Sequence, residues 1–187
     1  MNISEFLSIL SVAERLKCNT RHSVTSTGRT ESVAEHSWRL ALMAMLVAPE
    51  FPRADMNKVI RMCLIHDLGE AFTGDIPAFD KTQAHEEEEE AAYGAWVKTL
   101  PDQTREEFTE LLEEMNALQT LEAKIYKALD KMEAVIQHNE ADISSWLPLE
   151  YDLQLVYGEE NVQFSPWFRQ LKEEVNNWTR EKIREGR

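Results

Sequence analysis

The sequence predicts an all-α fold, a single helical bundle of about six to eight helices. Apolar residues recur in steps of three and four through residues 3–16, 120–141 and 165–184, which is the period of an amphipathic helix. Ser32 is followed three residues later by Glu35, a pattern that starts helices. The 187 residues contain six glycines and six prolines, few for a turn-rich β fold, and the length suits one domain.

The composition excludes several classes of partner. The formal net charge of −14, from 20 basic and 34 acidic residues, argues against a broad surface for nucleic acid polymers or anionic membranes. A small anionic substrate stays compatible, because a local arginine or metal ion can invert the field in a cleft. Cys18 and Cys63 give no disulfide framework. We find neither a signal peptide nor a membrane-length apolar stretch, so the cytoplasm is the simplest location.

The N-terminal third supplies basic groups and one inward histidine. After the helix over 3–16, the polar and irregular residues 17–31 predict a loop, and loops of this length are often functional. Its Arg21, His22 and Arg29 have the chemistry to grip a phosphate, although a merely solvated loop explains Arg29 equally well. The next helix starts at Ser32 and continues to about Val47, with His36 on its inward face.

A helix from about Met56 to Phe72, capped by Asp55, carries the polar groups around which the chain is organised. His66 and Asp67 are adjacent in an apolar run, and Glu70 lies one helical turn beyond both. Burying such groups is costly unless something pairs with them, and a divalent cation would do so. Gly74 and Pro77 then end the helix and leave Asp75 in a turn.

Further helices and one looser segment complete the predicted bundle. We expect helices from Thr82 to about Leu100, from the Thr104–Glu107 capping pattern to about Met115, from Thr120 to about Ala141, and from Ser165 to about Arg184. Residues 142–166 read as looser chain. Asp130 falls beside the apolar stripe of its helix, where it could face the interior or form a salt bridge with Lys127 or Lys131.

The inward polar groups come from three separate helices and form a reasonable set of metal ligands: His36, His66, Asp67 and Asp130. Two imidazoles and two carboxylates suit a borderline divalent ion and leave room for water and substrate. A metal would activate water, Glu70 could move the proton, and Arg21 could neutralise a phosphoryl group. These residues by themselves indicate metal-assisted hydrolysis of a phosphate ester.

The order His36, His66-Asp67, Asp130 resembles the H…HD…D signature of HD-domain phosphohydrolases. Arg21, residues 29–36, residues 66–70 and residues 73–77 further resemble the 5′-deoxynucleotidase branch of that family, with similarity from about residue 4 to 140 and weaker similarity beyond. The resemblance implies a single all-α HD domain over residues 1–187, in which 141–187 form a helical extension packed on the core. It also implies a homodimer.

The same resemblance implies roles for individual residues. The metal, typically Co²⁺, Mn²⁺ or a similar ion (Zn²⁺, Mg²⁺, Ni²⁺ and Fe²⁺ have compatible chemistry), would bind the four ligands named above. Glu70 would activate water and Arg21 would orient the 5′-phosphate, with Asp75 completing the catalytic groups. The substrate-binding residues would be Arg21, His22, His36, Asp67, Asp75, Ile76, Pro77 and Ala78. Asp75 and the residues after it would lie along the sugar and disfavour a 2′-hydroxyl. Where bacterial relatives often have tryptophan after the arginine, this chain has His22.

The expected function is therefore metal-dependent hydrolysis of nucleoside 5′-monophosphates, preferring 2′-deoxyribonucleotides, to nucleoside and phosphate. One alternative is another HD chemistry, such as cleavage of a nucleoside triphosphate or cyclic nucleotide, or a di-iron oxygenation. The other is a nucleotide-sensing protein that binds metal and ligand without turnover.

Overall fold

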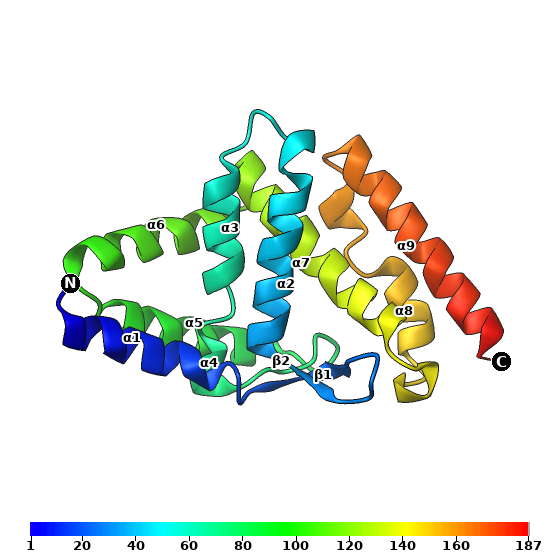
Figure 1. The fold of residues 1–187 in the computed structure, drawn as a ribbon, viewed down its shortest axis with the longest axis horizontal. Helices are drawn as coiled ribbons and strands as arrows, with labels where there is room; N and C mark the ends of the chain where they lie inside the picture. The colour runs from blue at the N-terminus through cyan, green and yellow to red at the C-terminus, as the bar shows by residue number, and fades with distance from the viewer. Residues whose placement is uncertain (187) are drawn as a thin grey trace.

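The computed structural model describes residues 1–186, and its long elements are helices (Figure 1). Seven helices of ten or more residues lie within this part of the chain: α1 (Ile3–Arg15), α2 (Val33–Val47), α3 (Met56–Ile65), α5 (Gln83–Val97), α6 (Asp102–Ala117), α7 (Leu121–Glu140) and α9 (Pro166–Glu185). Two short helices accompany them, α4 (Glu70–Thr73) and α8 (Glu150–Val156). The predicted all-α fold class is confirmed. In residues 1–186, no helix is both long and apolar enough to cross a bilayer.

Helices α2, α3 and α7 pack against one another at the centre of the molecule. Figure 1 shows α1, α4, α5 and α6 on one side of this centre and α8 and α9 on the other, with the two chain ends far apart. The central helices, with the turn that follows α3, carry the histidines and aspartates predicted to act together. Their mutual packing therefore decides where those side chains meet.

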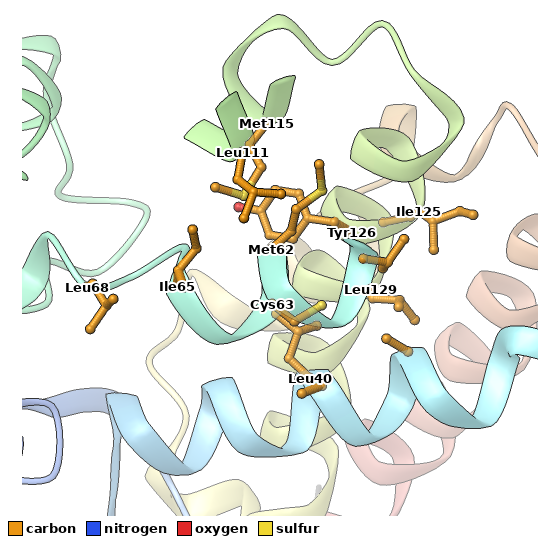
Figure 2. Close-up of a cluster of buried hydrophobic side chains, with 14 of the residues drawn as sticks. Leu40, Met62, Cys63, Ile65, Leu68, Leu111, Met115, Ile125, Tyr126 and Leu129 are labelled. Atoms are coloured by element: carbon orange, nitrogen blue, oxygen red, sulfur yellow. The ribbon is translucent and has the colours of Figure 1, made fainter. Parts of the chain in front are cut away.

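The hydrophobic core holds the central helices in register. Figure 2 shows apolar side chains from α2, α3, α6 and α7 meeting in one cluster. Leu40, Met62, Cys63, Ile125 and Leu129 within it are fully buried. Burying one such side chain contributes roughly 1.5–3 kcal/mol, so the cluster stabilises the helices that carry the polar groups.

Most of residues 17–31, predicted to be a loop, belongs to a β-hairpin over residues 20–32. Strand β1 (Thr20–Val24) pairs antiparallel with β2 (Thr30–Ser32), with Thr20 opposite Ser32 and Val24 opposite Thr30. The backbone N–H of Thr25 donates to the Arg29 carbonyl at 2.7 Å, and Gly28 adopts a φ of +80° that closes the turn. The loop prediction was wrong because these strands are short and polar and lack a clear alternation of apolar residues.

The predicted helix from Met56 to Phe72 is interrupted. Asp55 caps α3 as expected, but α3 ends at Ile65, and a turn over residues 66–69 precedes α4. In that turn Glu70 N–H bonds the Asp67 carbonyl at 3.0 Å, an i→i+3 bond in place of a helical one. Tyr93 of α5 donates its hydroxyl to the Ile65 carbonyl at 2.7 Å. The same carbonyl also accepts from Leu68 N–H at 3.1 Å, so the turn and the contact from 28 residues away share it.

Two further boundaries differ from expectation and one agrees. Helix α6 begins at Asp102, so Thr104 lies inside it and does not act as the cap. The segment 142–166, expected to be looser, contains α8. Thr120 caps α7 as predicted, since its hydroxyl accepts from Ala123 N–H at 3.2 Å. The boundary errors leave the positions of His36 and Asp130 on α2 and α7 unchanged.

Candidate active site

His36 lies one turn into α2, directly after the Ser32–Glu35 capping box, and is fully buried. Its Nδ1 contacts the carboxylate of Glu133 on α7, and Arg39 donates Nε–H to the other oxygen of Glu133 at 2.7 Å. Because Nδ1 of His36 contacts Glu133, Nε2 of His36 is the ring nitrogen that faces the other predicted metal ligands. Sequence analysis missed Glu133, although it follows Asp130 by three residues and so lies on the same side of the helix.

His66 and Asp67 meet His36 from the turn after α3. The carbonyl of Cys63 lies 2.9 Å from Nδ1 of His66, which again leaves Nε2 free. Nε2 of His36 and Nε2 of His66 are 3.3 Å apart. Oδ2 of Asp67 lies 3.0 Å from Nε2 of His66. The helix break after Ile65 therefore brings two adjacent residues to the same point, which a straight helix would point apart by about 100°.

Asp130 reaches the same point from α7. Its Oδ1 lies 3.4 Å from His36 Nε2 and 3.8 Å from His66 Nε2. Its Oδ2 pairs with Lys127 at 3.0 Å and Lys131 at 3.6 Å. The interior position and the salt bridge, expected as alternatives, thus coexist. Although burial opposes ionisation, the two lysines hold the pKa of this carboxyl well below its usual range.

The residues present fit a divalent cation. Two imidazole nitrogens and two carboxylates converge from α2, the turn after α3, and α7, and each imidazole has its Nδ1 oriented by another oxygen, a usual arrangement around metals. Burial and Arg21 disfavour the charged form of His36, but Glu133 and Asp130 prevail and raise its pKa to about 9. The acidic surroundings that favour a proton on His36 also favour a divalent cation, which would bind by displacing that proton.

Glu70 begins α4 beside this cluster and is buried. Among the described residues its Oε2 has no hydrogen-bond partner. Burial, together with the neighbouring carboxylates of Asp67 and Asp75, raises the pKa of Glu70 to about 10. The group therefore holds a proton at neutral pH, and a nearby cation would favour its release. An unpartnered carboxyl of this kind is placed to exchange a proton with a ligand.

Arg21 enters the site from β1. Its Nη1 lies 3.6 Å from Asp67 Oδ2 and its Nε lies 3.3 Å from Glu31 Oε2. Glu31 is itself fixed by a 2.8 Å hydrogen bond from the Ser23 hydroxyl. Although burial opposes the charged form, the surrounding acids raise the pKa of Arg21 further, so it stays a cation. Arg29, the other phosphate candidate, instead pairs with Glu35 at 2.7 Å and is exposed.

A cavity that is open to solvent lies beside Arg21 and Asp75. His22, Pro77, Ala78 and Phe79 contribute to its walls, together with residues of α7 and α8. Ile76 lies outside the lining that residues 1–186 provide. The structure therefore brings most of the predicted substrate-binding residues to one hollow that adjoins the ligand cluster through Arg21.

The pKa values of His36 and Glu70 predict how the cation-free protein responds to pH. Both side chains hold a proton in the folded state, with pKa values of about 9 and about 10, whereas an unfolded chain releases these protons near pH ~6.5 and ~4.3. The stability that these protons contribute is therefore fully present below the unfolded values and is lost as pH rises toward the folded ones.

We expect thermal unfolding with chelator present to show a loss of roughly 5 kcal/mol between pH 7 and pH 9, on the order of 10 °C in Tm. Added Mn²⁺ should reverse most of that loss, because it replaces the protons. A Tm that rises over this interval would contradict the assignment.

Comparison with known proteins places the chain in a family. The profile of the family described as "HD domain" matches residues 13–172, which include every residue of the ligand cluster. The human 5′-deoxynucleotidase HDDC2 is 33% identical over 142 residues, which cover 74% of this chain and 68% of the human protein. Its mouse counterpart is 37% identical over 115 residues, 60% of this chain and 56% of that protein. The chain thus spans between about half and two thirds of these relatives.

A solved structure gives the same result for the fold. The predicted metal-dependent phosphohydrolase from Magnetospirillum magnetotacticum superposes with a TM-score of 0.81 at 27% identity, covering 98% of this chain and 94% of the other. Sequence profile and three-dimensional likeness therefore agree over most of the chain. The chain belongs to the HD-domain family.

Proposed function

We propose that this protein is a metal-dependent 5′-deoxynucleotidase, which hydrolyses 2′-deoxyribonucleoside 5′-monophosphates to nucleoside and phosphate. The observation that carries the proposal is the convergence of His36, His66, Asp67 and Asp130 beside Arg21, which also lines a solvent-open cavity. The human and mouse relatives named as 5′-deoxynucleotidases support it. The similarity to a bacterial protein described as a predicted metal-dependent phosphohydrolase supports the metal dependence.

The two histidines and two aspartates would hold the cation, for which we propose Co²⁺ or Mn²⁺. When bound, such an ion supplies Lewis-acid activation of water and of the phosphate. Glu133 keeps His36 in the orientation that presents Nε2, and Lys127 and Lys131 keep Asp130 ionised. These neighbours set the ligands before any substrate arrives, so little reorganisation accompanies binding.

Arg21 would bind and orient the phosphate. Its guanidinium is held between Glu31 and Asp67, and its planar donors suit phosphate oxygens. It also offsets the negative charge that Asp67 and Asp75 would otherwise present to an anionic substrate. Glu70 would take up or release the proton during water attack, because its buried carboxyl lies near Asp67 and Arg21. Its pKa of about 10 can be lowered by a neighbouring positive charge.

The nucleoside would occupy the cavity beside Arg21. Asp75, Pro77 and Ala78 line it where they could lie along the sugar, and His22 and Phe79 add ring surface. A close fit at the sugar would disfavour a 2′-hydroxyl, which is the basis of the proposed deoxyribose preference. Ile76, outside the lining, would act through the position of its neighbours rather than by contact.

A phosphate-release assay with purified, metal-loaded protein tests the function. Matched deoxyribonucleoside and ribonucleoside 5′-monophosphates should both be assayed, with triphosphates and cyclic nucleotides as further substrates. We expect the deoxyribonucleotides to have a kcat/KM at least about tenfold higher, as a single unfavourable contact of about 1.4 kcal/mol produces. Turnover confined to triphosphates or cyclic nucleotides, or tight binding without phosphate release, would overturn the proposal.

We further propose that the protein works as a cytoplasmic homodimer. Apolar side chains are exposed along one face of α2, where Trp38 is 64%, Leu42 37% and Met45 60% accessible. A contiguous exposed apolar stripe of this kind marks an interaction surface. The free thiols of Cys18 and Cys63 are compatible with a reducing compartment.

Trp38→Glu should shift the protein from dimer to monomer, because it places a charge in the centre of the proposed interface. Light scattering coupled to size-exclusion chromatography measures the mass directly. Val156→Glu on α8 is the matched control, since Val156 is 63% exposed on another part of the molecule. A dimer that survives Trp38→Glu would exclude this face as the interface.

A further inference from the structure

A second group of metal-capable side chains lies on the wall of the cavity, and apart from the ring surface of His22 the reaction described above assigns it no role. His22 from β1, His138 from α7 and Glu150 from α8 bring three ligand atoms together. Oε1 of Glu150 lies 3.2 Å from His22 Nε2 and 2.9 Å from His138 Nε2. These residues come from separate elements of the chain and meet only because β1 and α8 flank the same stretch of α7.

The surroundings of His138 orient its ring toward the other two side chains. The carbonyl of Ala134 lies 3.0 Å from Nδ1 of His138, on the side of the ring away from the cluster. Nε2 is then the ring nitrogen that faces the carboxylate oxygen of Glu150, at 2.9 Å. An imidazole nitrogen and a carboxylate oxygen are both atoms that can bind a divalent cation.

The side chains are also fixed in place before any ligand arrives. Glu150 is 1% exposed, and its second oxygen accepts from Leu147 N–H at 2.7 Å, so only Oε1 is available. Trp146 packs edge-on against the His138 ring at 6.2 Å, and Phe79 does the same to His22 at 5.3 Å. Such support from neighbours is what orients ligands in metal sites.

We propose that His22, His138 and Glu150 form a second divalent-cation site, distinct in all its ligands from the HD cluster. Two imidazole nitrogens and one carboxylate oxygen select a borderline ion such as Zn²⁺ over Mg²⁺ or Ca²⁺. The separations of 2.9 and 3.2 Å are a few tenths of an ångström shorter than the ~3.3–3.6 Å between neighbouring ligands of a tetrahedral ion with bonds of ~2.0–2.2 Å, so small side-chain shifts would admit the ion. Three protein ligands leave a position for water on the cavity side.

Zinc stoichiometry of the full-length, tag-free protein tests this site. After chelator treatment and equilibrium dialysis against ZnCl₂, we expect two equivalents of Zn²⁺ per chain. His22→Ala and His138→Ala should each lower the count to one, and each should weaken the second equivalent by at least about tenfold. His85→Ala is the matched control, because His85 lies on α5 where it caps the helix through Thr82, and it should keep two equivalents.

Two outcomes overturn the proposal: a single equivalent in the unaltered protein, or two equivalents in both His22→Ala and His138→Ala. His22 is partly exposed, so its substitution keeps the test valid if the His138 variant fails to fold. Co²⁺ absorption provides an independent readout, since the difference spectrum between the unaltered protein and His22→Ala should show the visible bands of this site. If the protein releases phosphate but binds one equivalent of Zn²⁺, this inference fails and the proposed function stands. If it binds two equivalents of Zn²⁺ but releases no phosphate, the proposed function fails and this inference stands.

Discussion

Asp67→Ala is expected to lower kcat/KM for phosphate release from deoxyribonucleoside monophosphates by at least about a thousandfold. Asp67 contacts three components of the site at once: His66 Nε2 at 3.0 Å, Arg21 Nη1 at 3.6 Å, and His36 Nε2 at 3.8 Å. Removing its carboxylate takes away a cation ligand and leaves Arg21 without one of its two anchors. Steady-state kinetics and metal analysis of the same preparation measure both effects.

We expect the metal content of the variant to fall together with its activity. Asp152→Ala is the matched control, because this aspartate is exposed on α8 and belongs to neither histidine cluster. It should retain activity within about twofold. If Asp67→Ala kept its turnover within tenfold of the unaltered protein, the HD cluster would not be the catalytic centre.

Glu70→Gln is expected to reduce kcat by about a hundredfold to ten-thousandfold while the metal content stays close to normal. The substitution preserves size but removes the group that can take up and release a proton. Because Glu70 Oε2 is buried without a partner among the described residues, the amide can occupy the same space. A kcat measurement beside metal analysis separates a proton-transfer role from a ligand role.

The pH profile provides a second readout for Glu70. The limb of the kcat profile that belongs to this carboxyl should disappear in the variant, and a purely structural role would leave it in place. Glu86→Gln on the exposed face of α5 serves as the control and should change neither kcat nor the profile. Loss of metal in proportion to loss of rate would identify Glu70 as a ligand instead.

Much of the fold was predictable because its signals are local. The stripe of α7 and the caps at Ser32 and Thr120 depend on residues within one or two turns, and the structure confirms them. The convergence of two histidines and two aspartates was also foreseeable, because each lies on or beside an apolar face that must turn inward. The ligand role assigned to them stays a prediction.

The parts that escaped prediction depend on tertiary contacts. At the break after Ile65, the carbonyl of Ile65 accepts from the Tyr93 hydroxyl, which comes from another helix, as well as from Leu68 N–H. Glu133 looks like an ordinary helical acid until His36 is placed against it. The hairpin replaced the expected loop because its pairing involves backbone groups, which leave little trace in a short polar sequence. The meeting of β1 with the C-terminal half of α7 likewise has no local signal.

Helix α7 carries Asp130, Glu133 and His138, so one rigid element contributes to both histidine clusters. The step from Asp130 to His138 corresponds to an axial rise of about 12 Å. The helix therefore fixes the distance between Asp130 and His138 along its axis, because its backbone cannot stretch. A substitution that slid or rotated α7 would therefore displace its contributions to both histidine clusters together.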